Sequence, residues 1–387
     1  MPSAKVLPIL FCAAVMSLPS AFAGETHVEI QSPDPSKPGA NVAGLPDPQP
    51  VPSPKPLTQW HIIPIPFYTP ETQVGLALMF AFLFRFPEHL DARLSHNESA
   101  ATGTVRSQFQ LENRGEIFLK GEDWALAHSI MGKFWPDRYY GIGNSAVPEV
   151  YEGFERRSFE MQLDAGYRAF SRWYVGPMVD FRYIDPVPTR QEGILFEGQV
   201  AGSRPHWLLG VGGSLSWDSR DNNLNPAKGI FQETSYLFYP ALGSGFTFSR
   251  LAFDIRGYIP ILEGHVLALR FMSTLGFGNV PFTMMPYIGG DQRLRGIVET
   301  WVRDRDATFA VAEYRWNFWW RLGVTGFLGV GQARSSLLEY TLNGIHPAGG
   351  LGLRFLLLKD EMINLRVDLA YSDFQRLETY VSVGESF

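Results

Sequence analysis

The sequence predicts an all-β protein, namely a single-chain, transmembrane, antiparallel β-barrel of about sixteen strands. Apolar and polar residues alternate with a period of two over most of the chain, which is typical of strands with two different faces. The alternating runs are about 10–14 residues long, whereas strands of soluble sheets average ~5–6 residues and a tilted spanning strand needs roughly 9–11. No apolar run reaches the ~20 residues of a spanning helix, and the longest, 76–84, is about half that length.

The composition excludes several functional classes. The 387 residues carry a formal net charge of −6, and the sequence has no basic face of the kind that binds nucleic acid. Its single cysteine, Cys12, lies in a segment that we expect to be removed. We therefore expect a mature chain with neither disulfides nor thiol catalysis.

Residues 1–23 have the pattern of a cleaved signal peptide. Lys5 supplies positive charge, residues 6–16 form an apolar stretch, and an A-x-A cleavage site stands at 21–23. A membrane anchor is the alternative, but the apolar stretch is too short for it and Pro19 follows closely. The pattern favours an exported protein.

Residues 24–57 are rich in proline, which stands at almost every second position from Pro46 to Pro56. Proline removes a backbone donor, so this segment is expected to form neither helix nor strand ladder. It is either an extended, Pro-rich periplasmic linker or a plain disordered tail, and both interpretations remain open. The barrel is then expected to occupy 58–387.

The two faces of the expected strands differ in character, for example in 159–169 and 308–318, where an apolar or aromatic face opposes a polar one. Full charges on the polar faces suit a water-filled lumen behind a lipid-facing apolar surface; they include Arg256, Glu313, Arg315, Arg366 and Asp368. Trp316, Trp319 and Trp320 near one strand end fit an aromatic girdle. A soluble β-sandwich is the alternative.

The expected strands number sixteen, an even number as in bacterial single-chain barrels. They are 61–69, 73–85, 101–113, 115–121, 125–134, 157–170, 172–185, 206–218, 229–239, 248–259, 265–279, 306–319, 321–333, 345–358, 362–372 and 379–387. The first five have the weakest patterns, so fourteen strands remain an alternative.

The connections between these strands alternate in length. Short joints such as 170–172 and 320–321 alternate with longer connections at 135–156, 186–205 and 280–305. Bacterial barrels have short periplasmic turns and longer outer loops. We therefore expect both termini on the periplasmic side and residues 280–305 in an outer loop.

Four segments stand out from the alternating pattern. Residues 287–297 read YIGGDQRLRGI, with two glycines, an aspartate and two arginines between apolar flanks. Residues 217–221 read WDSRD and are followed by NPAKG, and residues 313–315 read EYR. Near the end of the chain, GLGLRF at 350–355 is followed by LRVDL.

In this order, the four segments resemble the BamA/TamA barrels, also called the bacterial surface antigen family. The resemblance is clear over about 200–387 and looser over 60–200. It implies an outer loop that folds back into the lumen, where an arginine docks on the inner wall. The matching residue is Arg295. A solvated pair of Arg293 and Arg295 on an exposed loop is the alternative.

The resemblance also implies which residues hold the loop. Gly289, Gly290 and Gly296 allow tight turns close to the wall, and a guanidinium fork binds carboxylates bidentately. Glu313 is the best-placed wall partner of Arg295, with Asp368 and Asp218 as alternatives. Two further sets follow from the resemblance: a strand-entry motif of Asp218, Arg220, Asp221, Pro226 and Gly229, and a C-terminal assembly signal of Val381, Val383 and Phe387 on one face, which Glu385 interrupts.

The sequence departs from the family pattern in two places. Gly329 stands where the family often has an aspartate in F-x-D-x-G, so the wall is expected to offer one carboxylate fewer. Residues 24–57 are too few for a single POTRA domain, and there is no room for a patatin-type lipase domain. The resemblance therefore implies a short form that lacks POTRA domains.

No catalytic pattern is visible. The sequence contains no G-x-S-x-G, H-E-x-x-H, P-loop or G-x-G-x-x-G motif, and its eight histidines are scattered. We therefore expect no enzymatic activity, no cofactor and no metal.

The resemblance implies an integral outer-membrane protein that takes part in outer-membrane biogenesis, by protein insertion or membrane maintenance. The implied mechanism is opening of the seam between the first and last strands, near Phe67 and Val381. Expected partners are outer-membrane lipids, the assembly machinery that inserts the barrel, and client outer-membrane proteins. A passive channel or structural barrel is the alternative. A membrane-embedded lipid hydrolase is a third hypothesis, and the sequence offers no convincing Ser/His pair for it.

Overall fold

The structure is a computed structural model that describes residues 58–387 except 90–91, 94, 146, 148, 223–224, 244 and 359–362. The expected signal peptide and Pro-rich linker lie outside the described residues. Among the described residues, no helix has the length and apolar character required to cross a membrane.

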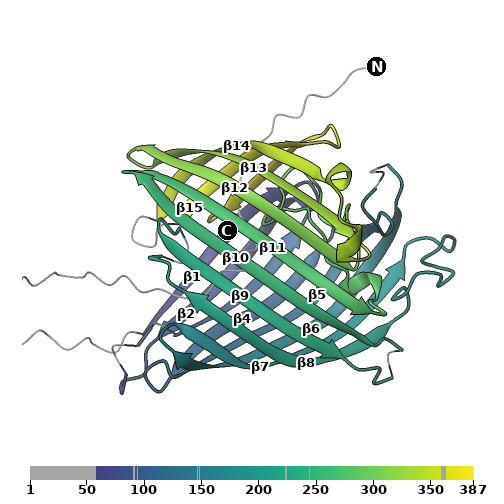
Figure 1. The fold of residues 1–387 in the computed structure, drawn as a ribbon, viewed down its shortest axis with the longest axis horizontal. Helices are drawn as coiled ribbons and strands as arrows, with labels where there is room; N and C mark the ends of the chain where they lie inside the picture. Colours follow the sequence, from purple (N-terminus) through teal and green to yellow (C-terminus); the bar gives the residue numbers. More distant parts are fainter. Residues whose placement is uncertain are drawn as a thin grey trace, which may run out of the picture.

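The chain forms a closed barrel of sixteen antiparallel strands, in which each strand pairs with its neighbours in sequence (Figure 1). The strands are β1 (Thr58–Thr69), β2 (Gln73–Phe84), β3 (Ser95–Thr104), β4 (Phe109–Leu119), β5 (Trp124–Tyr139), β6 (Glu152–Phe170), β7 (Trp173–Pro188), β8 (His206–Asp218), β9 (Gly229–Tyr239), β10 (Phe248–Leu262), β11 (His265–Gly278), β12 (Asp306–Trp319), β13 (Leu322–Arg334), β14 (His346–Leu358), β15 (Ile363–Ser372) and β16 (Leu377–Val383). Three short 3₁₀ turns lie in the connections: η1 (Phe282–Met284), η2 (Leu337–Glu339) and η3 (Leu342–Gly344). The prediction of a sixteen-stranded barrel is confirmed.

Most predicted strand boundaries lie within a few residues of the observed ones, and one pair is wrong. Residues 101–113 and 115–121 were expected as two strands, but a turn at 105–108 separates β3 from β4 inside the first of these ranges. That turn contains no glycine or proline and reverses the chain with Ser107 at a φ of +59°. Ser107 is the only one of its four residues of a type that is common in turns, so the sequence signal of this turn is weak.

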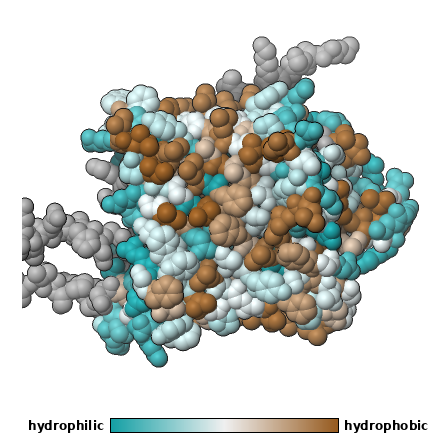
Figure 2. Space-filling view, viewed as in Figure 1, coloured by the Kyte–Doolittle hydropathy of each residue, from teal (hydrophilic) through white to brown (hydrophobic). Residues whose placement is uncertain are grey.

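The outer surface of the barrel is apolar. On β6, the outward side chains of Phe159, Leu163 and Tyr167 are exposed. Hydrophobic side chains are spread over the middle of the face in Figure 2, whereas hydrophilic ones gather toward its left and right edges. The exposed Trp319 and Trp320 lie at the end of β12. This surface has the character of a lipid-facing wall.

The lumen is filled by charged pairs and by one long connection. Asp254 on β10 pairs with Arg256 and with Arg270 on β11, at 2.7 Å each. Residues 279–305, between β11 and β12, contribute apolar side chains to the largest buried cluster, which comprises Tyr258, Ala268, Ile288, Leu294, Ile297, Val298, Trp301, Val302, Ala307, Phe309, Val311, Ala333, Ala348 and Phe387. We call residues 279–305 the lumen loop.

The barrel closes weakly at one place. β1 pairs with β2 along its whole length, from Thr58 to Thr69. On its other side, β1 shares a single registered residue pair with β16, Tyr68 with Val381. We call this contact between the first and last strands the seam.

Candidate functional site: a loop anchored inside the barrel

The glycines of the lumen loop allow its backbone to lie against the wall. Gly290 and Gly296 have φ values of +110° and +100°, which disfavour any residue with a side chain. At Gly296 a Cβ would also lie 3.2 Å from the main chain of Tyr371 on β15. The N–H of Gly296 donates to the hydroxyl of Tyr380 at 3.1 Å, and its carbonyl accepts from Ser372 at 2.7 Å. The loop is thus bonded to β15 and β16 through its backbone.

Arg295 extends from this turn into the barrel wall and is fully buried. Its Nη1 donates to Oδ2 of Asp368 on β15, and its Nη2 donates to Oε2 of Glu313 on β12. The guanidinium carbon lies 3.6 Å from the centre of the Phe327 ring on β13. A guanidinium suits this place because its planar fork binds two carboxylates and its face stacks on an aromatic ring.

Arg295 belongs to a balanced network of buried charges. Glu313 also accepts from Nε of Arg315 at 2.8 Å, and Asp368 accepts from Nη1 of Arg354 at 2.6 Å. The network contains four cations and four anions: Arg295, Arg315, Arg354, Arg366, Asp291, Glu313, Asp368 and Glu385. Burial alone would lower the pKa of Arg295, but Asp368 and Glu313 outweigh it and raise that pKa. Because each charge is paired, its desolvation cost is offset.

The C-terminal tail joins this network from inside the lumen. After β16, Gly384 turns the chain with a φ of +88°. Glu385 then pairs with Nε of Arg354 at 2.9 Å, and the main-chain oxygen of Phe387 accepts from Nη2 of Arg315 at 2.8 Å. The Phe387 ring packs against Tyr258, with centroids 6.5 Å apart.

This tail corrects one prediction. Phe387 was expected on the same face as Val381 and Val383, but only 7% of its surface is exposed and it contacts residues of the lumen. Val381 instead pairs with Tyr68 across the seam, and Val383 packs against the buried cluster of Ile65, Phe67 and Ala77 on β1 and β2. The turn at Gly384 places Phe387 away from that face.

Gly329 on β13 provides space for the loop. A Cβ at this position would lie 2.5 Å from Cδ1 of Leu294, which is buried. An apolar loop side chain therefore occupies the place where the family pattern has a wall carboxylate. The wall still supplies two carboxylates to Arg295, from Glu313 and Asp368.

Arg293 is placed differently from Arg295. Its guanidinium carbon lies 3.9 Å from the centre of the Tyr287 ring, and the Tyr287 hydroxyl donates to Glu299. Arg293 also lines a cavity inside the lumen. The two arginines therefore do not act as one solvated pair.

Asp218 is not a partner of the lumen loop, which corrects that alternative. Its two carboxylate oxygens accept from Nε and Nη2 of Arg220, at 2.9 and 2.6 Å. Both residues lie where β8 ends, at the tip of the barrel opposite the lumen loop. Arg220 engages both oxygens, so Asp218 contributes to a hairpin and not to the anchor.

The remaining residues of the strand-entry motif shape the same hairpin. Asp221 accepts from the N–H groups of Ala227 and Lys228, at 3.0 and 3.2 Å. Pro226 lies in this turn, and Gly229 begins β9 with a φ of +106°. The structure thus places the motif in a turn that is stabilised by side-chain to backbone bonds.

The turn between β1 and β2 also contacts the lumen loop. Oε1 of Glu71 accepts from the N–H of Glu299 at 2.7 Å. Burial, followed by the Glu299 carboxylate, raises the pKa of Glu71 from 4.5 to about 7. The turn that follows β1, the first strand of the seam, is therefore bonded to the lumen loop by the carboxyl group of Glu71, whose pKa is about 7.

Several residues of the anchor were not identified from the sequence. Arg354 lies in the GLGLRF segment, and its position on the polar face of that strand was the available signal. Ser372 and Tyr380 offered no comparable signal, because serine and tyrosine suit either face of a barrel strand. Their roles depend on the path of the lumen loop.

A model of the Omp85 superfamily domain matches residues 118–336, more than half of the chain. The protein belongs to the Omp85 superfamily. The match includes the lumen loop, the strand-entry motif and Glu313, and it begins earlier than the region of clearest resemblance in the sequence. It ends before Asp368 and the C-terminal tail. No curated protein matches this Omp85 chain.

Solved structures share the fold of this Omp85 barrel. BamA from Haemophilus ducreyi lacking POTRA domains 1–3 matches with a TM-score of 0.59 and 10% identity, covering 85% of this chain and 70% of that one. CdiB from Acinetobacter baumannii matches at 0.57 and 10% identity, covering 85% and 65%. CdiB from Escherichia coli matches at 0.56 and 8% identity, covering 85% and 67%. This family and fold imply an outer-membrane barrel.

Proposed function

We propose that this Omp85 protein takes part in outer-membrane biogenesis by opening its seam, so that an edge strand templates a client strand or perturbs nearby lipid. The role is non-enzymatic. The observation that carries the proposal is the seam, where β1 and β16 share only the pair Tyr68 and Val381. An unpaired strand edge binds other extended segments through its free backbone groups.

The side chains of β1 support this role. Trp60 and Ile62 are exposed on the outer surface, at 65% and 57%. Residues of β1 before Tyr68 have no registered partner in β16, so this part of β1 lacks a paired strand on that side. A client strand that enters from the membrane would meet both this edge and an apolar surface.

The anchor supports coupling between the seam and the lumen. β16 continues into the tail that carries Glu385 and Phe387, and both residues bond to the arginines that hold the wall carboxylates. Opening of the seam by movement of β16 would therefore pull on the network that holds Arg295. Opening of the seam and movement of the lumen loop are therefore expected to be coupled.

The partners follow from this role. They are outer-membrane lipids, client outer-membrane proteins, and the assembly machinery that inserts the barrel itself. These partners are proposed from the Omp85 superfamily to which the chain belongs and from the fold that it shares with BamA and CdiB.

The proposal is tested by client folding in liposomes that contain the purified barrel. The rate at which an unfolded outer-membrane protein becomes heat-modifiable is compared for the native barrel, Arg295→Ala and empty liposomes. Acceleration by the native barrel that Arg295→Ala reduces supports the proposal. A folded native barrel that gives no acceleration over empty liposomes contradicts it and favours a channel or structural role.

A further inference from the structure

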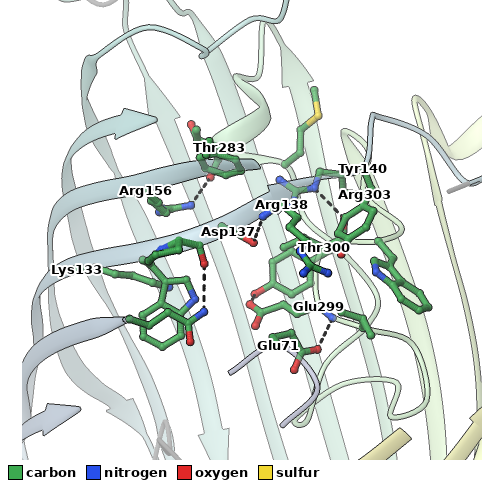
Figure 3. Close-up of a pocket in the computed structure, with 18 of the residues that line it drawn as sticks. Glu71, Lys133, Asp137, Arg138, Tyr140, Arg156, Thr283, Glu299, Thr300 and Arg303 are labelled. Carbon is green, nitrogen blue, oxygen red and sulfur yellow. Dashed lines mark hydrogen bonds between the residues drawn. The ribbon is translucent and has the colours of Figure 1, made fainter. Parts of the chain in front are cut away.

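The lumen contains a cavity of about 860 Å³ beside the lumen loop (Figure 3). Its walls come from the β1–β2 turn, β5, β6 and the loop, represented by Glu71, Lys133, Arg156 and Arg303 in the figure. Sites for small molecules in proteins have volumes of roughly 300–1,000 Å³. This cavity is therefore larger than a single small ion requires.

The cavity is cationic, although the chain as a whole carries a net charge of −6. Nine cationic residues line it: Arg106, Lys133, Arg138, Arg156, Arg182, Arg250, Arg293, Arg303 and Arg376. Five acidic residues oppose them: Glu71, Asp137, Glu160, Glu299 and Glu378. Two of these cations also pair with carboxylates outside the lining, Arg182 with Asp180 and Arg376 with Glu149, which leaves an excess of two positive charges. In the lumen, water screens charge less than at the outer surface.

Arg303 is a buried cation of this wall that the described residues leave without an ion pair. Only 4% of its surface is exposed, and its Nη2 has no hydrogen-bond partner in the part of the chain that the structure describes. Its Nε and Nη1 donate to the carbonyls of Thr300 and Phe282, at 3.2 and 3.5 Å. Within the described part of the chain, Arg303 makes no ion pair. Burial lowers the pKa of Arg303, and the attraction of Asp137 does not restore it.

Arg156 and Lys133 extend this cationic wall. The buried Nε of Arg156 has no hydrogen-bond partner among the described residues, while its Nη2 pairs with Glu160 at 2.9 Å. Lys133 lies over the Trp135 ring at 4.5 Å and makes no ion pair among the described residues. Arg156 lies within electrostatic range of both Lys133 and Arg303, and it repels each of these two cations.

We propose that this cavity binds a small phosphate-bearing anion, which Arg303, Arg156 and Lys133 hold. Guanidinium groups recognise phosphate through paired, charge-assisted hydrogen bonds, and an ammonium binds it as a point charge. Aromatic and methionine side chains in the wall, such as Trp135 and Met285, provide apolar surface for an organic part. The phosphate comes either from a free solute or from a lipid headgroup, because the cavity extends to Tyr68 and Glu378 beside the seam.

The site is tested by calorimetric titration of pyrophosphate into the purified barrel in neutral detergent. We expect saturable binding that Arg303→Gln and Lys133→Gln each weaken about tenfold or more, the size of a lost charge-assisted bond. Arg157→Gln is the matched control, because Arg157 lies on the outer face of β6, 52% exposed and paired with Glu155. Heat-modifiability of each variant checks that it is folded.

A second titration identifies the source of the phosphate. The same measurement is made in nanodiscs of phosphatidylcholine with and without phosphatidylglycerol. Weaker pyrophosphate binding in the presence of phosphatidylglycerol supports a lipid headgroup as the occupant, and unchanged binding supports a free solute. No saturable binding to the native barrel overturns the proposal. So does native-like binding by folded Arg303→Gln and Lys133→Gln variants.

Discussion

Arg295 of the lumen loop and Asp368 of β15 form a salt bridge in which neither side chain is exposed to solvent. They are separated by 73 residues in sequence, and Glu313 of β12 completes the contact. The loop is therefore held to two different strands of the wall by one guanidinium. Truncating one partner of a buried charge pair leaves the other uncompensated, which costs far more than the net contribution of the pair.

Arg295→Ala is expected to destabilise the barrel by about 3–5 kcal/mol, because it leaves Glu313 and Asp368 with reduced compensation in the lumen. The measurement is the temperature at which the folded band is lost on a heat-modifiability gel. Arg157→Ala, which removes an exposed cation from the outer face, is the control and is expected to change little. Equal effects of the two substitutions would show that the anchor does not stabilise the barrel.

Gly296→Ala is expected to destabilise the barrel more than Gly290→Ala. Both glycines have positive φ, so both substitutions strain the backbone. Only at Gly296 would the new Cβ press on the main chain of Tyr371, at 3.2 Å, whereas the nearest atom at Gly290 is 3.6 Å away. The same gel assay ranks the two variants, and a reversed order would contradict the loop path described above.

Gly329→Asp is expected to be destabilising although it introduces the residue that the family pattern has at this position. The new side chain would clash with Leu294 and would add a negative charge to a balanced network. Leu294→Ala combined with Gly329→Asp is expected to recover part of the loss, because it vacates the space. If the losses of stability from the two single substitutions simply add in the double variant, Leu294 does not occupy the place of the family's aspartate.

The stability of the folded barrel is expected to fall as pH rises, because burial and the neighbouring Glu299 carboxylate disfavour ionisation of Glu71. The folded-state pKa of Glu71 is about 7, above its ordinary 4.5, so the folded protein binds this proton more tightly than the unfolded chain. The stability that this group contributes is present below pH 4.5 and is lost as pH rises toward 7. Heat-modifiability measured from pH 5 to 8 should show this decline in the native barrel. Glu71→Gln, which cannot ionise, should flatten it, and an unchanged pH profile in that variant would rule out Glu71 as the group responsible.

Alternation in the sequence was sufficient to predict the barrel, whereas the position of its anchor followed from the resemblance to the BamA/TamA barrels. Period-two alternation located most strands because each strand of this barrel separates an apolar outer face from a polar lumen. The motif around Arg295 indicated Glu313 and Asp368, since both lie on lumen-facing positions. Asp218 was also expected on a lumen-facing position. In the structure it binds its neighbour Arg220 instead. The alternation of the sequence does not show which of these carboxylates Arg295 binds.

Other features depend on long-range geometry that alternation does not encode. The inward path of Phe387 follows from one turn at Gly384 and from a place between Tyr258 and Arg315, which are distant in sequence. The cationic cavity likewise assembles Lys133, Arg156 and Arg303 from two strands and the lumen loop. Each of these residues has an ordinary sequence context.

The most direct test of seam opening uses a reversible covalent link across it. Tyr68 and Val381 are direct antiparallel partners, and such pairs lie at distances that disulfides bridge. The only native cysteine is Cys12, in the expected signal peptide, so Tyr68→Cys with Val381→Cys would introduce one defined pair. Val211→Cys with Phe238→Cys, which links the continuously paired β8 and β9, is the control.

Client folding in liposomes is then measured for both linked barrels under oxidising conditions and again after reduction. A barrel that works through its seam should lose its acceleration of client folding when residues 68 and 381 are linked, and regain it on reduction. The control link should have no effect. Full acceleration with a completely linked seam would contradict the proposal that the seam opens.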